Sequence, residues 1–101
     1  MENSKTFLVI TAIVNKQNIA EVPEYLGGVM KIFGQNGGKP VGRYKTINSL
    51  IGEGSPEMMA IIEFDNPKTI EDMISGEDFN DLAELRARVF TKLNMVISQN
   101  M

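Results

Sequence analysis

Two strand-like segments of this chain are apolar on both faces, and the chain is too short to cover both faces by itself. The first covers residues 7–14 (FLVITAIV), and the second covers residues 58–62 (MMAII). A strand with one solvent-exposed face alternates apolar and polar side chains, so an almost continuous apolar run indicates burial on both sides. The chain's own helices can cover one face. The other face needs a second chain, a ligand or both, which predicts a homodimer with an enclosed space between two sheets.

The apolar spacing along the chain predicts a single α+β domain over residues 1–101, with a ferredoxin-like β-α-β-β-α-β order and a four-stranded antiparallel sheet. The second helix of this order is expected to be broken at Ser75–Gly76, with Asp78 as the N-cap of its second part. We expect strands at residues 6–14, 40–50, 57–64 and 93–98, and helices at residues 18–35, 66–74 and 79–89.

The composition excludes several classes of function. Thirteen acidic residues stand against ten basic ones, and no basic cluster forms, so a nucleic-acid surface is not expected. The chain has no cysteine and no histidine, which removes disulfides, thiolate catalysis and the commonest zinc and haem ligands. We therefore assign no metal or cofactor to it. The first apolar run, about eight residues, is too short for a membrane span, and we expect a soluble cytoplasmic protein.

The predicted strands at residues 6–14, 57–64 and 93–98 each have one purely apolar parity and one mixed parity. The purely apolar parities are expected to pack on the helices, and the mixed parities are expected to face the second chain. An apolar wall with a few polar groups fits a small-molecule cavity, but a wet dimer interface whose polar groups satisfy each other fits it equally. The polar members of the mixed sets are Thr11, Glu63, Asn94 and Ser98.

Arg86 is the least expected residue of the chain, because it falls near the middle of the apolar arc of the last helix. A buried guanidinium needs a strong acceptor, since an unpaired buried charge is very costly. The alternative is a side chain that reaches past its neighbours to solvent. The candidate carboxylate partners are Glu63, Asp65 and Glu53.

Glu63 and Arg43 are the other candidates for chemistry. In a dry cavity the pKa of Glu63 would rise and it could act as a general base, whereas pairing with Arg86 or Arg43 would keep it ionised and structural. Arg43 could hold a carboxylate-bearing ligand through two hydrogen bonds. It could equally be an edge-strand charge that discourages aggregation of the sheet.

Short motifs follow one another in a characteristic order over residues 6–96. They are Tyr25, Gly37–Gly38, Arg43, Glu53–Gly54, Glu63–Phe64, Ser75, Asp78–Phe79 and Arg86. Their order and spacing resemble the domain of unknown function 1330 (DUF1330) family, small bacterial proteins of the dimeric α/β-barrel superfamily. The chain departs from the family's usual pattern at Tyr44, where a glycine is expected, and at Met73–Ile74, where an aromatic pair is expected.

The resemblance implies a homodimer in which two four-stranded sheets pack into a barrel. The wider superfamily includes cofactor-free monooxygenases, haem-degrading enzymes, muconolactone isomerases and stress-response proteins. The resemblance implies no particular activity, and the lack of histidine argues against haem degradation. Arg43, Glu63 and Arg86 match positions of the family's pattern.

Two functions therefore stay open. The first is a homodimer that binds a small apolar or anionic molecule and could act as a cofactor-independent enzyme, with Glu63 as the best catalytic candidate. Its substrate contacts would be Arg43, Glu63, Arg86, Thr11 and Asn94. The alternative is a non-catalytic oligomerisation or regulatory module, in which Arg86, Glu63 and Arg43 form a closed ion-pair network. RNA recognition through the sheet is not expected, because exposed aromatic residues on the central strands are missing.

Overall fold

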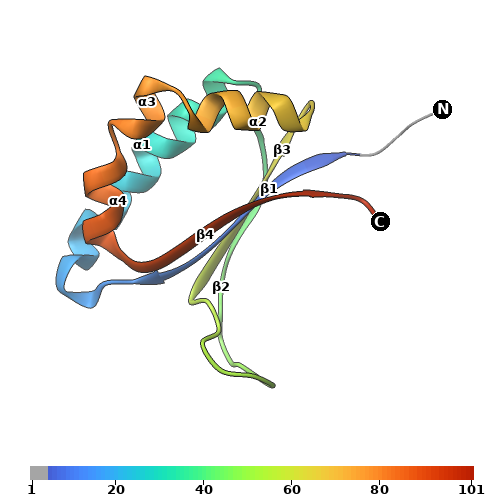
Figure 1. The fold of residues 1–101 in the computed structure, drawn as a ribbon. Coiled ribbons are helices and arrows are strands. Elements are labelled where there is room, and N and C mark those ends of the chain that lie inside the picture. Colours follow the sequence, from blue (N-terminus) through green and yellow to red (C-terminus); the bar gives the residue numbers. More distant parts are fainter. Residues whose placement is uncertain (1–4) are drawn as a thin grey trace.

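The computed structural model describes residues 5–101 and has a four-stranded antiparallel sheet with all its helices on one face (Figure 1). The strand order is β2-β3-β1-β4. This confirms the ferredoxin-like α+β prediction. No helix in this part of the chain is long and apolar enough to cross a membrane. The elements are β1 (Thr6–Val14), the 3-10 helix η1 (Lys16–Glu21), α1 (Val22–Gln35), β2 (Lys39–Lys45), β3 (Met58–Phe64), α2 (Pro67–Ile74), α3 (Glu77–Asn80), α4 (Ala83–Val89) and β4 (Phe90–Gln99).

Helix α1 forms where one apolar stripe follows a proline that is tolerated in the first turn. It ends at Gln35, and the turn after it needs two glycines, Gly37 and Gly38, for two different reasons. Gly37 has a φ of 82°, which side chains other than glycine rarely adopt. A Cβ at Gly38 would lie 2.8 Å from both the Phe33 carbonyl oxygen and the Phe64 ring, so only glycine lets the chain turn this tightly from α1 into β2.

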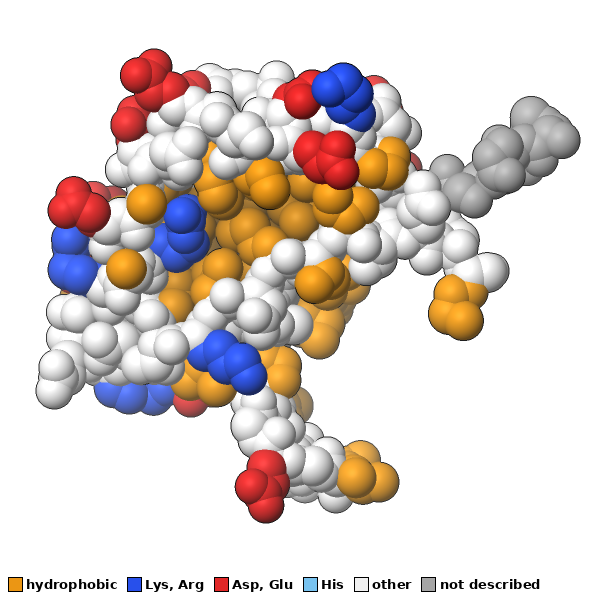
Figure 2. Space-filling model, viewed as in Figure 1, with side chains coloured by type: hydrophobic (Ala, Val, Ile, Leu, Met, Phe, Trp, Pro, Cys, Tyr) orange, Lys and Arg blue, Asp and Glu red, His pale blue; other side chains and the backbone are white. Residues whose placement is uncertain are grey.

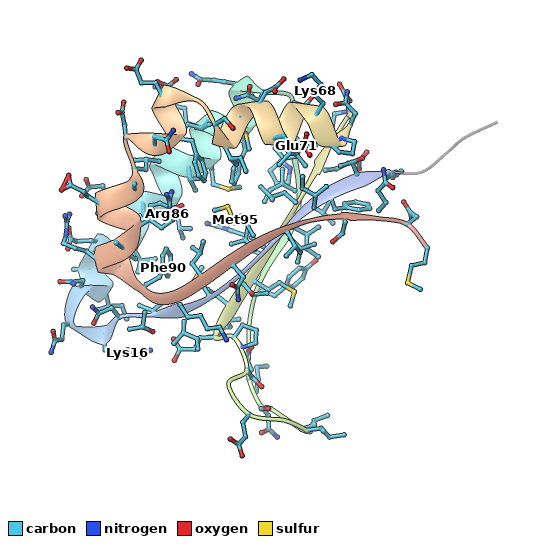
Figure 3. All side chains as sticks on the ribbon, in the orientation of Figure 1. Lys16, Lys68, Glu71, Arg86, Phe90 and Met95 are labelled. Carbon is cyan, nitrogen blue, oxygen red and sulfur yellow. The ribbon has the colours of Figure 1, made fainter. Side chains whose placement is uncertain are left out.

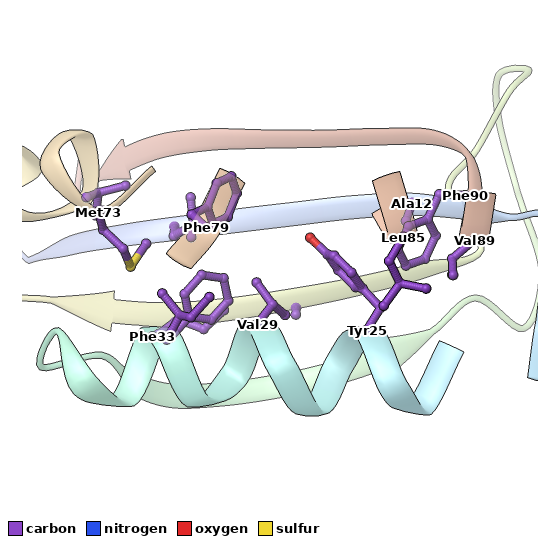
Figure 4. Close-up of a cluster of buried hydrophobic side chains, with 14 of the residues drawn as sticks. Ala12, Tyr25, Val29, Phe33, Met73, Phe79, Leu85, Val89 and Phe90 are labelled. Atoms are coloured by element: carbon purple, nitrogen blue, oxygen red, sulfur yellow. The ribbon is translucent and has the colours of Figure 1, made fainter. Parts of the chain in front are cut away.

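The core lies between the helices and the purely apolar parities of β1, β3 and β4, as the alternation predicts (Figure 4). Leu8 pairs in register with Ile62 of β3 and with Ile97 of β4. Two aromatic rings of α1 make edge-to-face contacts with rings of the sheet. The ring centroids are 5.4 Å apart for Tyr25 and Phe90, and 6.1 Å apart for Phe33 and Phe64. These contacts fix α1 along the length of the sheet.

The predicted helix over residues 79–89 is wrong in its detail, because this stretch forms two short helices. Helix α3 has Gly76, not Asp78, as its N-cap, and Asp78 lies in its first turn. Leu82 separates α3 from α4 with a φ of −92° and a ψ of 2°. Its side chain packs against Gly28 of α1, within about 3.3 Å of where a Cβ would stand. Packing between helices therefore overrides local helix propensity here.

Strands β2 and β4 also differ from their predicted bounds. Strand β4 begins at Phe90, earlier than predicted, because this residue is extended and buried. Strand β2 ends at Lys45 rather than at Leu50. One further backbone hydrogen bond joins Thr46 to Glu57 at 2.9 Å, after which the chain leaves the sheet. We call residues 46–57 the arm; it projects away from the helices (Figure 1).

The opposite face of the sheet, here the open face, carries no helix of residues 5–101 (Figure 1). It exposes about half of the Tyr44, Val41 and Val96 side chains. It also contains a depression of about 260 Å³. Phe7, Val9, Val41, Ile61 and Ser98 line this depression.

Candidate functional site

An apolar pocket lies between α1 and the sheet and touches all four strands. Figure 2 shows an apolar hollow between the helices and β4. The enclosed part of the pocket has a volume of about 20 Å³, enough for one water molecule. It continues past Leu26, Met30 and Arg43 into an outer groove of about 620 Å³, which Pro23 and Gly27 also line. The two spaces together form an apolar site with one guanidinium, that of Arg43, at its mouth.

Tyr25 lines this pocket from α1, and its side chain is only 1% exposed. Its hydroxyl points away from α1 toward the space between helices and sheet (Figure 4). Burial raises the pKa of Tyr25 above its usual 10.0, and the nearby guanidinium of Arg86 partly opposes this shift. The proximity of Arg86 does not produce a hydrogen bond of normal geometry, since the Tyr25 hydroxyl has no partner among the described residues.

Arg86 comes from α4, on the helix side of the sheet (Figure 3), and lies near the Tyr25 hydroxyl. Its guanidinium carbon lies 4.7 Å from the centroid of the Phe79 ring. Its Nη1 atom is buried and has no acceptor in residues 5–101. The Tyr25 hydroxyl and the Arg86 Nη1 group are thus two neighbouring hydrogen-bond donors at the edge of an apolar pocket, and neither has a partner in this part of the chain. One oxygen atom could accept a hydrogen bond from both.

The structure separates the candidate residues of the sequence between the two faces of the sheet. Arg43 pairs in register with the buried Ala60, so it lies on the helix face together with Arg86. Glu63 has the opposite parity to the buried Ile62 and lies on the open face. Within residues 5–101, none of the candidate carboxylate partners of Arg86, which are Glu63, Asp65 and Glu53, forms an ion pair with it. Glu63 instead lies 4.0 Å from Lys5.

Thr11 and Asn94 are cross-strand partners on the open face. They line a small hollow of about 60 Å³ together with Gly54 and Pro56, where the arm joins the sheet. This hollow is on the other side of the sheet from the pocket beneath the helices. Thr11, Asn94 and Glu63 therefore belong to a surface that a second chain could complete, and not to the pocket that Tyr25 lines.

Tyr25 is the residue that sequence reasoning did not assign to a site, although it belongs to the motif order of the family. A signal was present, because it is the one residue with a polar end among the buried positions of the α1 stripe. Arg86 was singled out correctly as a charge on an apolar arc. Within residues 5–101, no three acidic or other ligand-type side chains are grouped to hold a metal ion.

Solved structures of similar fold cover almost the whole chain at low sequence identity. A protein of unknown function from Rhodopseudomonas palustris has a TM-score of 0.79 at 14% identity, covering 99% of this chain and 85% of that one. A DABB family protein with a ferredoxin-like fold from Mesorhizobium loti has a TM-score of 0.72 at 12% identity, covering 98% and 99%. These likenesses show the fold alone.

A putative antibiotic biosynthesis monooxygenase from Bacteroides thetaiotaomicron is similar as well, with a TM-score of 0.65 at 11% identity, covering 98% of this chain and 90% of that one. A search of curated protein sequences finds no match. A comparison with protein families is more informative, because one family matches the chain over residues 5–101. The chain belongs to this family, which is described as Domain of unknown function (DUF1330).

Proposed function

We propose that this protein binds a small organic molecule with an apolar body and an oxygen-bearing head group in the pocket beneath its helices. One observation carries the proposal: Tyr25 Oη and Arg86 Nη1 are both buried without a hydrogen-bond partner among residues 5–101. Leaving a buried polar group unsatisfied costs about 1–3 kcal/mol. A carbonyl or carboxylate oxygen would remove this cost by accepting from both donors.

The rest of the pocket suits the remainder of such a molecule. Leu26 and Met30 provide apolar contacts in both the enclosed pocket and the outer groove. Met30 is unbranched and polarisable, so it adapts to ligands of different shape. Arg43 lies where the two spaces meet and would attract an anionic ligand or hold a second carboxylate.

The same two donors could serve a reaction that builds negative charge on the bound oxygen. Donors that are already in place stabilise such charge without reorganising, and a site that excludes water strengthens their effect. The similarity in fold to a putative antibiotic biosynthesis monooxygenase supports the proposal that the bound ligand is turned over. Glu63, Thr11 and Asn94 lie on the opposite face, so their proposed roles are contacts with a second copy or with a ligand held between two copies.

We also propose that the protein is a homodimer whose two open faces pack on each other. The open face exposes three large apolar side chains by about half, those of Val41, Tyr44 and Val96. A sheet with one bare apolar face exposes an interaction surface, and a second copy of the chain presents the same surface in return.

Binding can be tested with benzoate, which joins a small apolar ring to a carboxylate, and with the neutral analogue benzamide. Arg86→Met and Tyr25→Phe should each weaken benzoate binding by about 10- to 100-fold, the loss of one charge-assisted hydrogen bond. Lys31→Met, an exposed lysine of the same helix as Tyr25, is the matched control and should bind as the wild type does. Equal binding by all four proteins would contradict the proposal.

The small enclosed volume of the pocket, about 20 Å³, favours one alternative. In that alternative a single ordered water molecule satisfies Tyr25 and Arg86, and the protein is a non-catalytic oligomerisation or regulatory module. A high-resolution crystal structure distinguishes the two. A water between the two side chains that persists after soaking in benzoate would support the module, whereas its displacement by a carboxylate would support the binding protein.

A further inference from the structure

We propose that the arm clasps a second copy of this chain and places its aliphatic side chains in the apolar depression of the partner's open face. The inference rests on the homodimer proposed above and adds the element that holds the two copies in register. It concerns residues 46–57, which belong to no helix or strand and take no part in the pocket beneath the helices.

The arm exposes more apolar surface than is usual for a solvent-exposed loop. Ile47, Leu50 and Ile51 are 93%, 87% and 93% exposed. A single exposed aliphatic residue is ordinary, but three within five positions on one projecting segment mark an interaction site. The arm carries one charged residue between Thr46 and Pro56, which is Glu53. It is therefore suited to an apolar partner surface.

The arm is held in shape before any partner binds. Its root continues the β2–β3 ladder through the hydrogen bond from Thr46 N–H to the Glu57 carbonyl. The Ser49 and Ser55 hydroxyl oxygens lie 2.7 Å apart across the loop. Gly52 and Gly54 both have positive φ and make the turn. An arm with this internal bonding presents its side chains at fixed positions, which lowers the entropic cost of docking.

Lys16 and Val14 hold the arm's root to the rest of the domain. The Glu57 carboxylate accepts hydrogen bonds from the Lys16 Nζ at 2.8 Å and from the Val14 N–H at 2.9 Å. These bonds tie the start of β3 to the end of β1. The direction in which the arm projects is therefore set by the sheet itself.

The acceptor surface lies on the same sheet face, at the opposite end of the strands. The arm leaves the sheet beside Lys45 and Met58, which are register partners. The depression lies toward Phe7 and Val41, near the other end of β2, and no charged residue lines it. Figure 1 shows the arm extending on the side away from the helices, which is the side of the open face.

This placement makes the chain complementary to itself. A two-fold axis that lies between two open faces and crosses the strands puts the arm end of each sheet over the far end of the other. Each arm then meets the partner's depression, and the two contacts are identical and closed. The radius of gyration, 14.1 Å, also exceeds the roughly 13 Å expected of a compact domain of this length. A projecting arm that completes a larger unit would account for such a shape.

The first test is the dimer dissociation constant, measured by sedimentation of the full chain. The variant Ile47→Ser/Leu50→Ser/Ile51→Ser should weaken dimerisation by at least about 100-fold, since each buried aliphatic side chain is worth roughly tenfold or more. Ile19→Ser is the matched control, because Ile19 is 56% exposed but lies on η1, outside the arm. The control should dimerise as the wild type does.

The second test uses the absence of native cysteine. The double variant Val41→Cys/Ile51→Cys should form a covalent dimer under mild oxidation, and each single variant should form it much less. A dimer that tolerates the triple change and forms no crosslink would overturn the arm but leave the sheet dimer intact. A wild-type monomer would overturn both. A monomer that cosediments with phosphatidylglycerol vesicles would overturn the clasp and identify a membrane-contacting loop.

Discussion

Arg86 lies against the ring of Phe79, with its guanidinium carbon 4.7 Å from the ring centroid, while its Nη1 atom is buried without an acceptor in residues 5–101. The ring face attracts the cation and holds it in place. The missing acceptor is a cost that this attraction offsets only in part. Arg86 therefore keeps a buried donor without an acceptor, at a cost to the stability of the protein.

Replacing Arg86 with methionine tests this relationship. The free energy of unfolding of the Arg86→Met variant should equal that of the wild type or exceed it by up to about 1 kcal/mol. The substitution removes an unsatisfied buried donor but keeps the apolar contact with Phe79. Urea unfolding at matched protein concentration measures the difference. Arg86→Ala is the control and should be less stable, because it loses the packing as well. A large destabilisation by Arg86→Met would mean that the guanidinium already has a partner.

Tyr25 provides a second check on the same site. The chain has only two tyrosines, so Tyr44→Phe leaves Tyr25 as the sole phenol. Its absorbance should titrate with a pKa above 10.0, because burial disfavours the phenolate. Adding Arg86→Met should raise that pKa further, since the guanidinium stabilises the phenolate. An unchanged midpoint after the second substitution would show that Arg86 is not close to the hydroxyl.

The sequence was sufficient to predict the sheet and its two faces, because strand parity is a local and periodic signal. It also marked Arg86 as a charge on an apolar arc. It could not place Arg86 beside Tyr25, because that neighbourhood depends on how α4 packs against α1. The break between α3 and α4 was missed for the same reason, since Leu82 packs on Gly28 of a different helix.

Ion-pair partners were the least predictable part of the candidate site. Glu63 and Arg86 lie on opposite sides of the sheet. Their opposite charges made Glu63 a candidate partner of Arg86. The direction of the Glu63 side chain is set by strand parity, however, and that of Arg86 by the phase of the helix. A shift of one residue in the phase reverses the side on which a group lies. The apolar tip of the arm was missed because residues 46–50 were assigned to a strand.

The adjacent glycines of α1 allow a matched comparison of helix propensity with packing. Gly27 has open space where a Cβ would stand, whereas a Cβ at Gly28 would lie 3.3 Å from a methyl carbon of Leu82. Gly27→Ala should raise the unfolding free energy by about 0.5–1 kcal/mol, the usual gain in a helix interior. Gly28→Ala should gain less or lose stability, because Leu82 must move. Thermal unfolding of the two variants gives the comparison, and equal gains would contradict the packing assigned to Leu82.

Acid should destabilise the fold through two exposed carboxylates. Hydrogen bonding to Lys16 and to the Val14 N–H lowers the pKa of Glu57 below its usual 4.5, and hydrogen bonding to Arg88 lowers that of Glu21. A carboxyl whose pKa is depressed by folding contributes stability above its unfolded pKa, and this contribution is lost as the pH falls through the folded value. Stability should therefore decline below about pH 4.5, the unperturbed value.

Substitution of either carboxylate should remove its share of this dependence. Glu57→Gln and Glu21→Gln should each be less stable than the wild type at pH 7, and the difference should shrink toward zero at pH 3 as the wild-type groups become protonated. Urea midpoints at the two pH values measure this convergence. Glu71→Gln, on the exposed side of α2, controls for the loss of one charge. A gap between Glu57→Gln and the wild type that stayed constant with pH would show that the glutamate contributes through packing, and not through its charge.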